Sequence, residues 1–360
     1  MASIMTNASA LTALQSLNST NKNLEATQSR ISTGYRVNDA SDNAAYWSIA
    51  TTMRSDNQAM TTVQDALGLG ASKVDTAYTG MNKAIDTVNQ IKVKLVAAYG
   101  ATDADKAKIQ TEIASLQAQM KSYAEAATFS GTNMLSVTST KDAAGAAAAA
   151  DTGVQQDVKV VSAFNRNSSG AASISTIDIK VEGTKLFDSG TAANLKNAGV
   201  LDRETAIYST AKAQDAFEST FATQIAGGAT DTAAKTAAAT AATAADGTAT
   251  VIATKSVFNL DITAAADGTI GAMLSKVDSV LKQMTTAATN LGAAKSRIDL
   301  QKTFTQSLMD SIDRGVGQLV DADMNKESTR LQALQVQQQL GIQALSIANS
   351  GSQSILSLFR

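Results

Sequence analysis

The strongest pattern in the chain is a run of apolar and small residues, spaced alternately three and four positions apart, between Met60 and Leu95. The run is unbroken and includes Gly70, Ala77 and Ala84. A heptad pattern of this kind is typical of a helix in a coiled coil, and at 1.5 Å per residue this helix would be about 50 Å long. We therefore expect the chain to fold around long, closely packed helices.

Two further segments carry the same helical spacing. Gly100 and Asp103 mark the end of the first helix and the start of a second, and the short connection predicts an antiparallel helical hairpin. The spacing resumes at Ile270 and continues less regularly to Ile312. The residues expected on the coiled-coil seam are Met60, Val63, Leu67, Val74, Met81, Val88, Leu95, Ile113, Leu116, Leu274, Val277 and Leu281.

Both ends of the chain lack charged side chains, over Met1 to Asn21 and over Leu331 to Phe359. Glutamines among the leucines of the C-terminal segment argue against a membrane span. Heptad spacing gives one seam at each end: Ala10, Leu14, Leu17, Asn21, Leu24, Gln28 and Ile31, and Leu331, Leu334, Gln338, Gly341, Leu345, Ala348, Ser352, Ile355 and Phe359. Other apolar residues lie off these seams, so we expect the two end helices to pair with each other and with other copies.

The middle of the chain has a different character, and we interpret residues 140–255 as a surface-exposed insert with mixed α/β or β-rich structure. Apolar residues alternate from Val158 and up to Val181, which predicts strands, and a short helix is expected around Arg203 to Ile225. The Ala- and Thr-rich segment 230–250 is expected to be loop or loosely ordered helix. A last strand is predicted at 258–262. The fold class is therefore mainly α, a long helical hairpin formed by both ends with this smaller insert.

The composition excludes several classes of function. The 360 residues include no His, Cys or Pro, and the formal net charge is −2. Imidazole triads, thiol nucleophiles and the usual zinc sites are therefore excluded, and dispersed basic residues argue against nucleic-acid binding. We expect no enzyme activity and no cofactor. The absence of proline has two readings: compositional drift, or selection for threading a narrow channel and then folding without slow prolyl isomerisation. No secretory signal is visible, which predicts another export route.

Three local features have a structural explanation and a functional alternative. The acidic residues around Asp321 and Asp323 could suggest a metal, but a solvated or salt-bridged helix face is the favoured interpretation. Gly70 is expected to allow two helices to approach closely. The aromatic pair Tyr46 and Trp47 is interpreted as a packing anchor, with a contact between subunits as the alternative.

Both ends of the sequence resemble bacterial flagellin, the family of flagellar filament subunits. Residues 30–45 follow the family's RLSSGxRINxAxDDAA pattern, and residues 345–360 read LxxANxxxQxxLxLxR. Residues 129–135 and the Asp321-Ala-Asp323 segment with Glu327 also match. The resemblance covers roughly residues 1–135 and 255–360 and does not extend to the insert.

The resemblance implies a secreted, extracellular structural subunit that self-assembles into a helical filament for swimming. It implies an inner core of terminal helices (1–44 and 313–360), a coiled-coil helical domain (45–139 and 256–312) and the exposed insert. Implied partners are other flagellin subunits, the type III export apparatus, an export chaperone, and the filament cap and junction proteins. The core residues so implied are Leu11, Leu14, Leu17, Leu24, Ile31, Leu331, Leu334, Leu345, Ile355 and Phe359. The alternatives are a hook–filament junction protein and a secreted coiled-coil effector or adhesin.

Departures from the family pattern bear on immune recognition. Asn43 replaces a common aspartate within the segment 29–50 that plant receptors sense in many flagellins. Ile91 is placed where the family often has an arginine contacted by the animal receptor. We therefore expect weak recognition by both receptors, with Arg30, Gly34, Asp42, Asn43 and Ile91 as the residues concerned.

Overall fold

The computed structural model describes residues 7–138, 157–167, 171–189, 198–226 and 231–358, and within these no side chains of residues 226, 231, 232, 252, 253 and 351–358. The chain forms two compact units, one from Met1–Thr61 with Gln306–Arg360 and one from Thr62–Thr305. The fold is mainly helical with a smaller strand-containing insert, as predicted.

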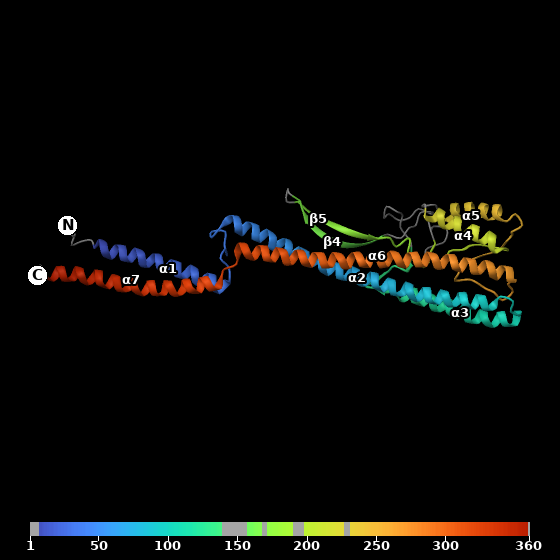
Figure 1. Cartoon of the computed structure of the whole chain (residues 1–360), viewed down its shortest axis with the longest axis horizontal. Coiled ribbons are helices and arrows are strands. Elements are labelled where there is room, and N and C mark those ends of the chain that lie inside the picture. The colour runs from blue at the N-terminus through green and yellow to red at the C-terminus, as the bar shows by residue number, and fades with distance from the viewer. Residues whose placement is uncertain (1–6, 139–156, 168–170, 190–197, 227–230, 359–360) are drawn as a thin grey trace. The chain divides into compact units, whose positions relative to one another are not determined.

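The first unit contains two long helices that run side by side in opposite directions, α1 (Ala8–Thr33) and α7 (Met324–Leu358) (Figure 1). The side chain of Asn7 accepts a hydrogen bond from the amide of Ala10 and so caps the start of α1. The helix ends at Gly34, which has a left-handed backbone with φ of 77°. The unit also includes the start of α2 (Ala44–Ala98) and the end of α6 (Asp267–Val320).

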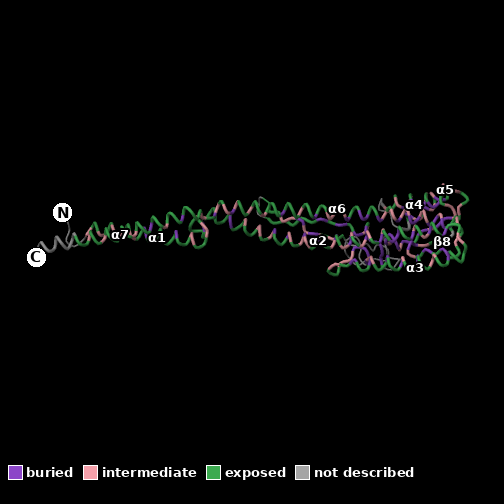
Figure 2. Tube along the Cα trace, turned by 60° about the horizontal axis from the view of Figure 1, so that its bottom comes forward, coloured by how far each residue is buried: buried purple, intermediate pink, exposed green. Residues whose placement is uncertain are grey.

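The second unit is built on a helical core from α2, α6 and α3 (Asp103–Ala126). Thr102 caps α3, because its side chain accepts from the amide of Asp105. Gly100, with φ of 73°, provides the turn before it. Figure 2 shows the contrast in burial: purple is concentrated around α3, α4 and β8, whereas α1 and α7 are mostly green and pink.

A tight hairpin follows α3. Strands β1 (Thr128–Phe129) and β2 (Thr132–Asn133) pair antiparallel around Ser130 and Gly131, which both have positive φ. Two residues with positive φ are what a two-residue hairpin turn requires. Strand β3 (Ser136–Val137) then pairs parallel with β6 (Phe187–Asp188).

The main hairpin of the insert consists of β4 (Val158–Arg166) and β5 (Ala172–Ile179), which pair antiparallel with a bulge between Val161 and Ala163. The hairpin packs against α2 at Gly70, where a β-carbon would overlap with the side chain of Val160. Gly70 therefore allows close approach, as predicted, but its neighbour is a strand and not a second helix.

The rest of the insert pairs a second hairpin with two helices. Strands β7 (Thr205–Tyr208) and β8 (Val251–Lys255) are antiparallel, and the chain between them forms α4 (Ala211–Ala226) and α5 (Asp231–Ala245). The two helices enclose a small core that consists of Tyr208, Ala213, Phe217, Phe221, Ala234, Ala238 and Ala242.

Three local predictions for this region were wrong or incomplete. The helix expected from Arg203 begins only at Ala211, because the preceding residues form β7. The Ala/Thr segment is a regular helix, since its alanines at intervals of four pack against the aromatic residues of α4. The predicted strand at 258–262 is not formed: its apolar side chains are buried against the helices without a strand partner.

Candidate assembly interface

Small and hydroxylated residues make most of the face of α1 that packs against α7. The partly or fully buried positions are Ala10, Ala13, Leu17, Thr20, Leu24, Thr27 and Ile31. The sequence predicted Leu14, Asn21 and Gln28 in place of Ala13, Thr20 and Thr27, but those three residues are exposed. Both sets have heptad spacing, and hydrophobicity favours Leu14 over Ala13, whereas close packing of two helices favours the small residue.

From Leu331 to Ser350 of α7, the partly or fully buried positions are Leu331, Leu334, Gln338, Gly341, Leu345 and Ala348, the same positions that heptad spacing places on the seam. At Gly341 an added β-carbon would lie 3.2 Å from Cδ1 of Leu17, so this glycine makes room for the leucine. The side chain of Ile355 and all of Phe359 lie outside the described residues.

Polar side chains cross the same seam. Nε2 of Gln338 donates to Oδ1 of Asn21 at 2.8 Å. Nδ2 of Asn7 donates to the backbone carbonyl of Ala348 at 3.0 Å. These contacts bridge the two helices, but they replace apolar burial, so the seam is weak for its length.

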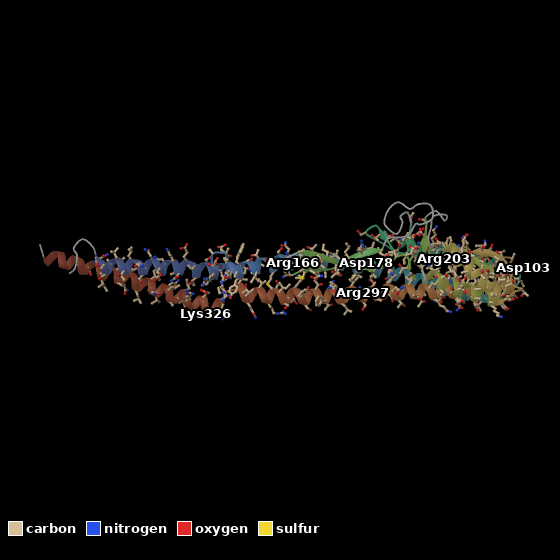
Figure 3. All side chains as sticks on the ribbon, turned by 90° about the horizontal axis from the view of Figure 1, so that it is seen from above. Asp103, Arg166, Asp178, Arg203, Arg297 and Lys326 are labelled. Carbon is tan, nitrogen blue, oxygen red and sulfur yellow. The ribbon has the colours of Figure 1, made fainter. Side chains whose placement is uncertain are left out.

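One ion pair lies at the end of the seam nearest the connectors. Nη1 of Arg30 is 3.5 Å from Oε1 of Glu327, whose side chain is only 10% exposed. Oε2 of Glu327 is buried and has no hydrogen-bond partner within the described part of the chain. The carboxylate therefore depends on Arg30. Lys326, the residue immediately before Glu327, is exposed (Figure 3).

Large apolar side chains remain exposed on the other faces of both helices. Their exposed fractions lie between 48% and 72%. They are Leu11 and Leu14 on α1, and Val336, Leu340, Ile342 and Ile347 on α7. Apolar groups that surround a helix pair on several sides indicate a surface that other protein covers.

The two connectors that lead into the terminal helices bind each other. The amides of Arg36 and Val37 donate to the carbonyl of Val320 at 2.6 and 3.3 Å. The amide of Ala322 donates to the carbonyl of Gly34 at 2.8 Å. We call this set of backbone contacts, between residues 34–37 and 319–322, the connector clasp. It fixes where α1 ends relative to where α7 begins.

The acidic residues near the clasp have structural roles. Asp323 caps α7, because its carboxylate accepts from the amides of Asn325 and Lys326. Asp321 takes part in a β-bridge with Tyr35. Within the described residues no group of acidic side chains is placed to hold a metal ion.

The residues predicted on the coiled-coil seam lie in the interior. The α2 residues Met60, Val63, Leu67, Val74, Met81, Val88 and Leu95 are all buried. On α3 and α6, Ile113 and Val277 are fully buried, while Leu116, Leu274 and Leu281 are partly buried against the same core.

The residues singled out for immune recognition have different environments. Asp42 is exposed and accepts from the amide of Asn38, and Asn43 caps α2 by accepting from the amide of Tyr46. Ile91 is fully buried in the helical core, so its side chain cannot be a surface contact of the folded monomer.

A buried lysine joins the insert to α6, and the sequence analysis missed it. Nζ of Lys276 donates to the backbone carbonyls of Thr205 and Lys255, at the paired ends of β7 and β8. Burial lowers the pKa of Lys276 to about 8. The available signal was position: Lys276 lies three residues after Met273 and four before Val280, on the buried face of α6.

Glu218, a buried glutamate on α4, lies close to Lys276. Burial raises the pKa of Glu218, and Nε2 of Gln214 donates to its carboxylate at 2.8 Å. The positive charge of Lys276 acts in the opposite direction on that pKa, as does Arg203 more weakly (Figure 3). The arrangement joins a helix, a hairpin and α6, and is structural in character.

The described part of the chain contains no helix long and apolar enough to cross a bilayer.

Comparison with known proteins gives a consistent family. Residues 4–140 match the bacterial flagellin N-terminal helical region, and residues 274–359 match the bacterial flagellin C-terminal helical region. Flagellin C of Rhizobium meliloti (strain 1021) is 47% identical over 361 residues, and the flagellin of Brucella melitensis biotype 1 is 46% identical over 360. Flagellin A of Rhizobium meliloti is 46% identical over 408 residues. In each comparison all of both chains is covered.

Three observations point to the same family: the helical terminal regions, the exposed apolar faces of the end helices, and the full-length similarity. The chain belongs to the bacterial flagellin family and is a structural subunit of the extracellular flagellar filament.

Proposed function

We propose that α1 and α7 carry polymerisation, and that their exposed apolar faces become buried only between subunits. The observation that carries this proposal is the set of off-seam side chains such as Leu340 and Ile347, which are 59% and 72% exposed in the single chain. Contacts between different surfaces of identical subunits, repeated without closing into a ring, produce a helical filament. Within this proposal Leu11 and Leu14 serve intersubunit contacts, and Leu17, Leu24, Ile31, Leu331, Leu334 and Leu345 hold the helix pair together.

We further propose the three-part organisation and the finer partners that the family implies. Terminal helices would form the inner core, the helical domain a surrounding shell, and residues 140–255 the outer surface. The subunit would be exported unfolded through the flagellar type III channel with a chaperone, and added beneath the cap next to junction proteins. The lack of proline and cysteine supports this route, since neither slow prolyl isomerisation nor stray disulfides would delay folding after export.

Polymerisation of purified chains, followed by light scattering and electron microscopy, tests the first proposal. We expect long filaments from the full chain and none from a chain that ends at Gln335, which lacks most of α7. A finer test is Leu340→Gln combined with Ile347→Gln, which we expect to abolish or strongly slow polymerisation. Gln339→Ala is the matched control, because residue 339 is exposed on the same helix without an apolar side chain. Normal filaments from the double variant would contradict the proposal.

We also propose weak recognition by plant and animal flagellin receptors. Support comes from Asn43, whose side chain is committed to capping α2, and from the burial of Ile91. Strong receptor activation by the purified monomer would refute this.

A further inference from the structure

The apolar part of the α1–α7 seam repeats every seven residues, so it selects a register only weakly. Leu331 and Leu345 lie seven positions on either side of Gln338, and on α1 Leu17, Leu24 and Ile31 are likewise seven apart. A slip of one heptad would therefore place similar side chains against each other.

The amide contact across the seam has the same weakness. In the observed register Gln338 donates to Asn21. A slip of seven residues in one direction brings Gln28 opposite Gln338, and a second amide can accept the same hydrogen bond. Amide pairing therefore does not exclude the slipped register.

The ion pair at the base of the seam does exclude it. No charged residue lies within Met1 to Asn21 or within Leu331 to Phe359, so the seam offers few alternative cations. In the slip that brings Gln28 opposite Gln338, Glu327 would face Val37, beyond the end of α1, and in the opposite slip it would face Asn23, so in neither register does it face Arg30. Its carboxylate is largely buried, and its second oxygen already lacks a partner in the described structure. An unpaired buried charge is strongly unfavourable.

We propose that Arg30 and Glu327 determine the register of α1 against α7, and so select the one alignment of the terminal helices that is competent for filament assembly. This inference rests on the proposed role of these helices in polymerisation. The connector clasp lies one helical turn away and limits slippage from the other side, through the amide of Ala322 and the carbonyl of Gly34.

The chain contains no cysteine, so a pair of introduced cysteines reports the register without background. Asn21→Cys with Gln338→Cys reports the observed register, because these side chains are in hydrogen-bond contact. Asn21→Cys with Leu331→Cys, or with Leu345→Cys, reports a slip of one heptad in either direction. Filaments of the full chain are oxidised and then denatured, and only the monomer band is scored, because a crosslink between subunits migrates as a dimer.

With Arg30 and Glu327 intact, we expect the 21–338 crosslink to predominate. With Glu327→Gln we expect the slipped crosslinks to rise at least several-fold, while Lys326→Gln, a control at an exposed neighbour, leaves the pattern unchanged. The exchange of charges, Arg30→Glu with Glu327→Arg, should restore the original pattern.

An unchanged crosslink pattern in Glu327→Gln filaments would overturn the proposal. If Glu327→Gln forms no filaments, assembly by the charge-exchanged variant supports the proposal, and failure of that variant as well overturns it. These outcomes are separate from the role of the helices in assembly, which fails if the chain ending at Gln335, or the variant with both Leu340→Gln and Ile347→Gln, still polymerises normally.

Discussion

Val160 of β4 packs so closely on Gly70 of α2 that a β-carbon at residue 70 would overlap with both methyl groups of the valine. The β4–β5 hairpin is therefore closely fitted to α2 at this glycine, and Gly70→Ala should force the hairpin away. We expect a loss of about 1 to 3 kcal/mol in the free energy of unfolding, measured by urea denaturation.

Gly68→Ala is the matched control. Nothing lies within 4 Å of a β-carbon there, and helix propensity should make that variant neutral or up to about 1 kcal/mol more stable. Equal effects at the two glycines would contradict the close fit.

The turn between β1 and β2 should discriminate between substitutions at adjacent positions. Gly131 has φ of 74°, so Gly131→Ala is expected to cost about 1 to 2 kcal/mol. Ser130 also has positive φ, at 49°, so Ser130→Gly should be neutral or stabilising. Thermal unfolding of the two variants beside the unaltered chain tests this, and a stable Gly131→Ala variant would show that the turn has another conformation.

The buried Lys276 should make stability depend on alkaline pH. Its pKa is about 8 in the folded chain and near the ordinary 10.5 when unfolded. Between these values the unfolded state binds more protons, so raising the pH favours the folded state. Relative to Lys276→Met, the unfolding free energy of the unaltered chain should therefore rise from about pH 8 to 10.5, by at most about 1.4 kcal/mol per pH unit. Urea titrations at several pH values measure the difference, and a flat difference would contradict the buried, charged lysine.

Proteolysis should separate the two ends of the chain from the rest. Many positions of the seam between α1 and α7 are Ala, Thr, Gly or Gln. The seam therefore buries too little apolar surface to offset the conformational entropy that is lost when two long helices become ordered. In the isolated monomer we expect the ends to be disordered, so that a nonspecific protease removes both first and leaves residues near 45–310. Mass spectrometry of a limited digest measures this. Filaments should protect the same ends, and equally resistant ends in the monomer would contradict the expectation.

Helical spacing was enough to predict the helical architecture and the residues of its core. It failed at α1, where Leu14 was expected on the seam and Ala13 occupies it. Heptad spacing marks apolar residues whether they pack within one chain or between subunits. Leu14 is exposed in the single chain and is available to a neighbouring subunit, so spacing alone cannot tell these two kinds of contact apart. It also missed Lys276 and the pairing of Arg30 with Glu327, because each depends on which distant segment lies opposite.

The insert was harder to predict for a different physical reason. The Ala/Thr segment has little hydrophobic contrast, so nothing local distinguishes a loop from α5. Its helix is stabilised by the aromatic side chains of Phe217 and Phe221, which lie on another helix.

The chain leaves β7 at Tyr208 and returns to β8 at Val251, and these two residues are paired neighbours in the same hairpin. The connection between them therefore begins and ends at adjacent positions of one hairpin. Its length can therefore change without moving the two strands apart. The turn at Gly247, where a β-carbon would meet nothing within 4 Å, is therefore a natural place to graft a foreign epitope or enzyme for display along a filament.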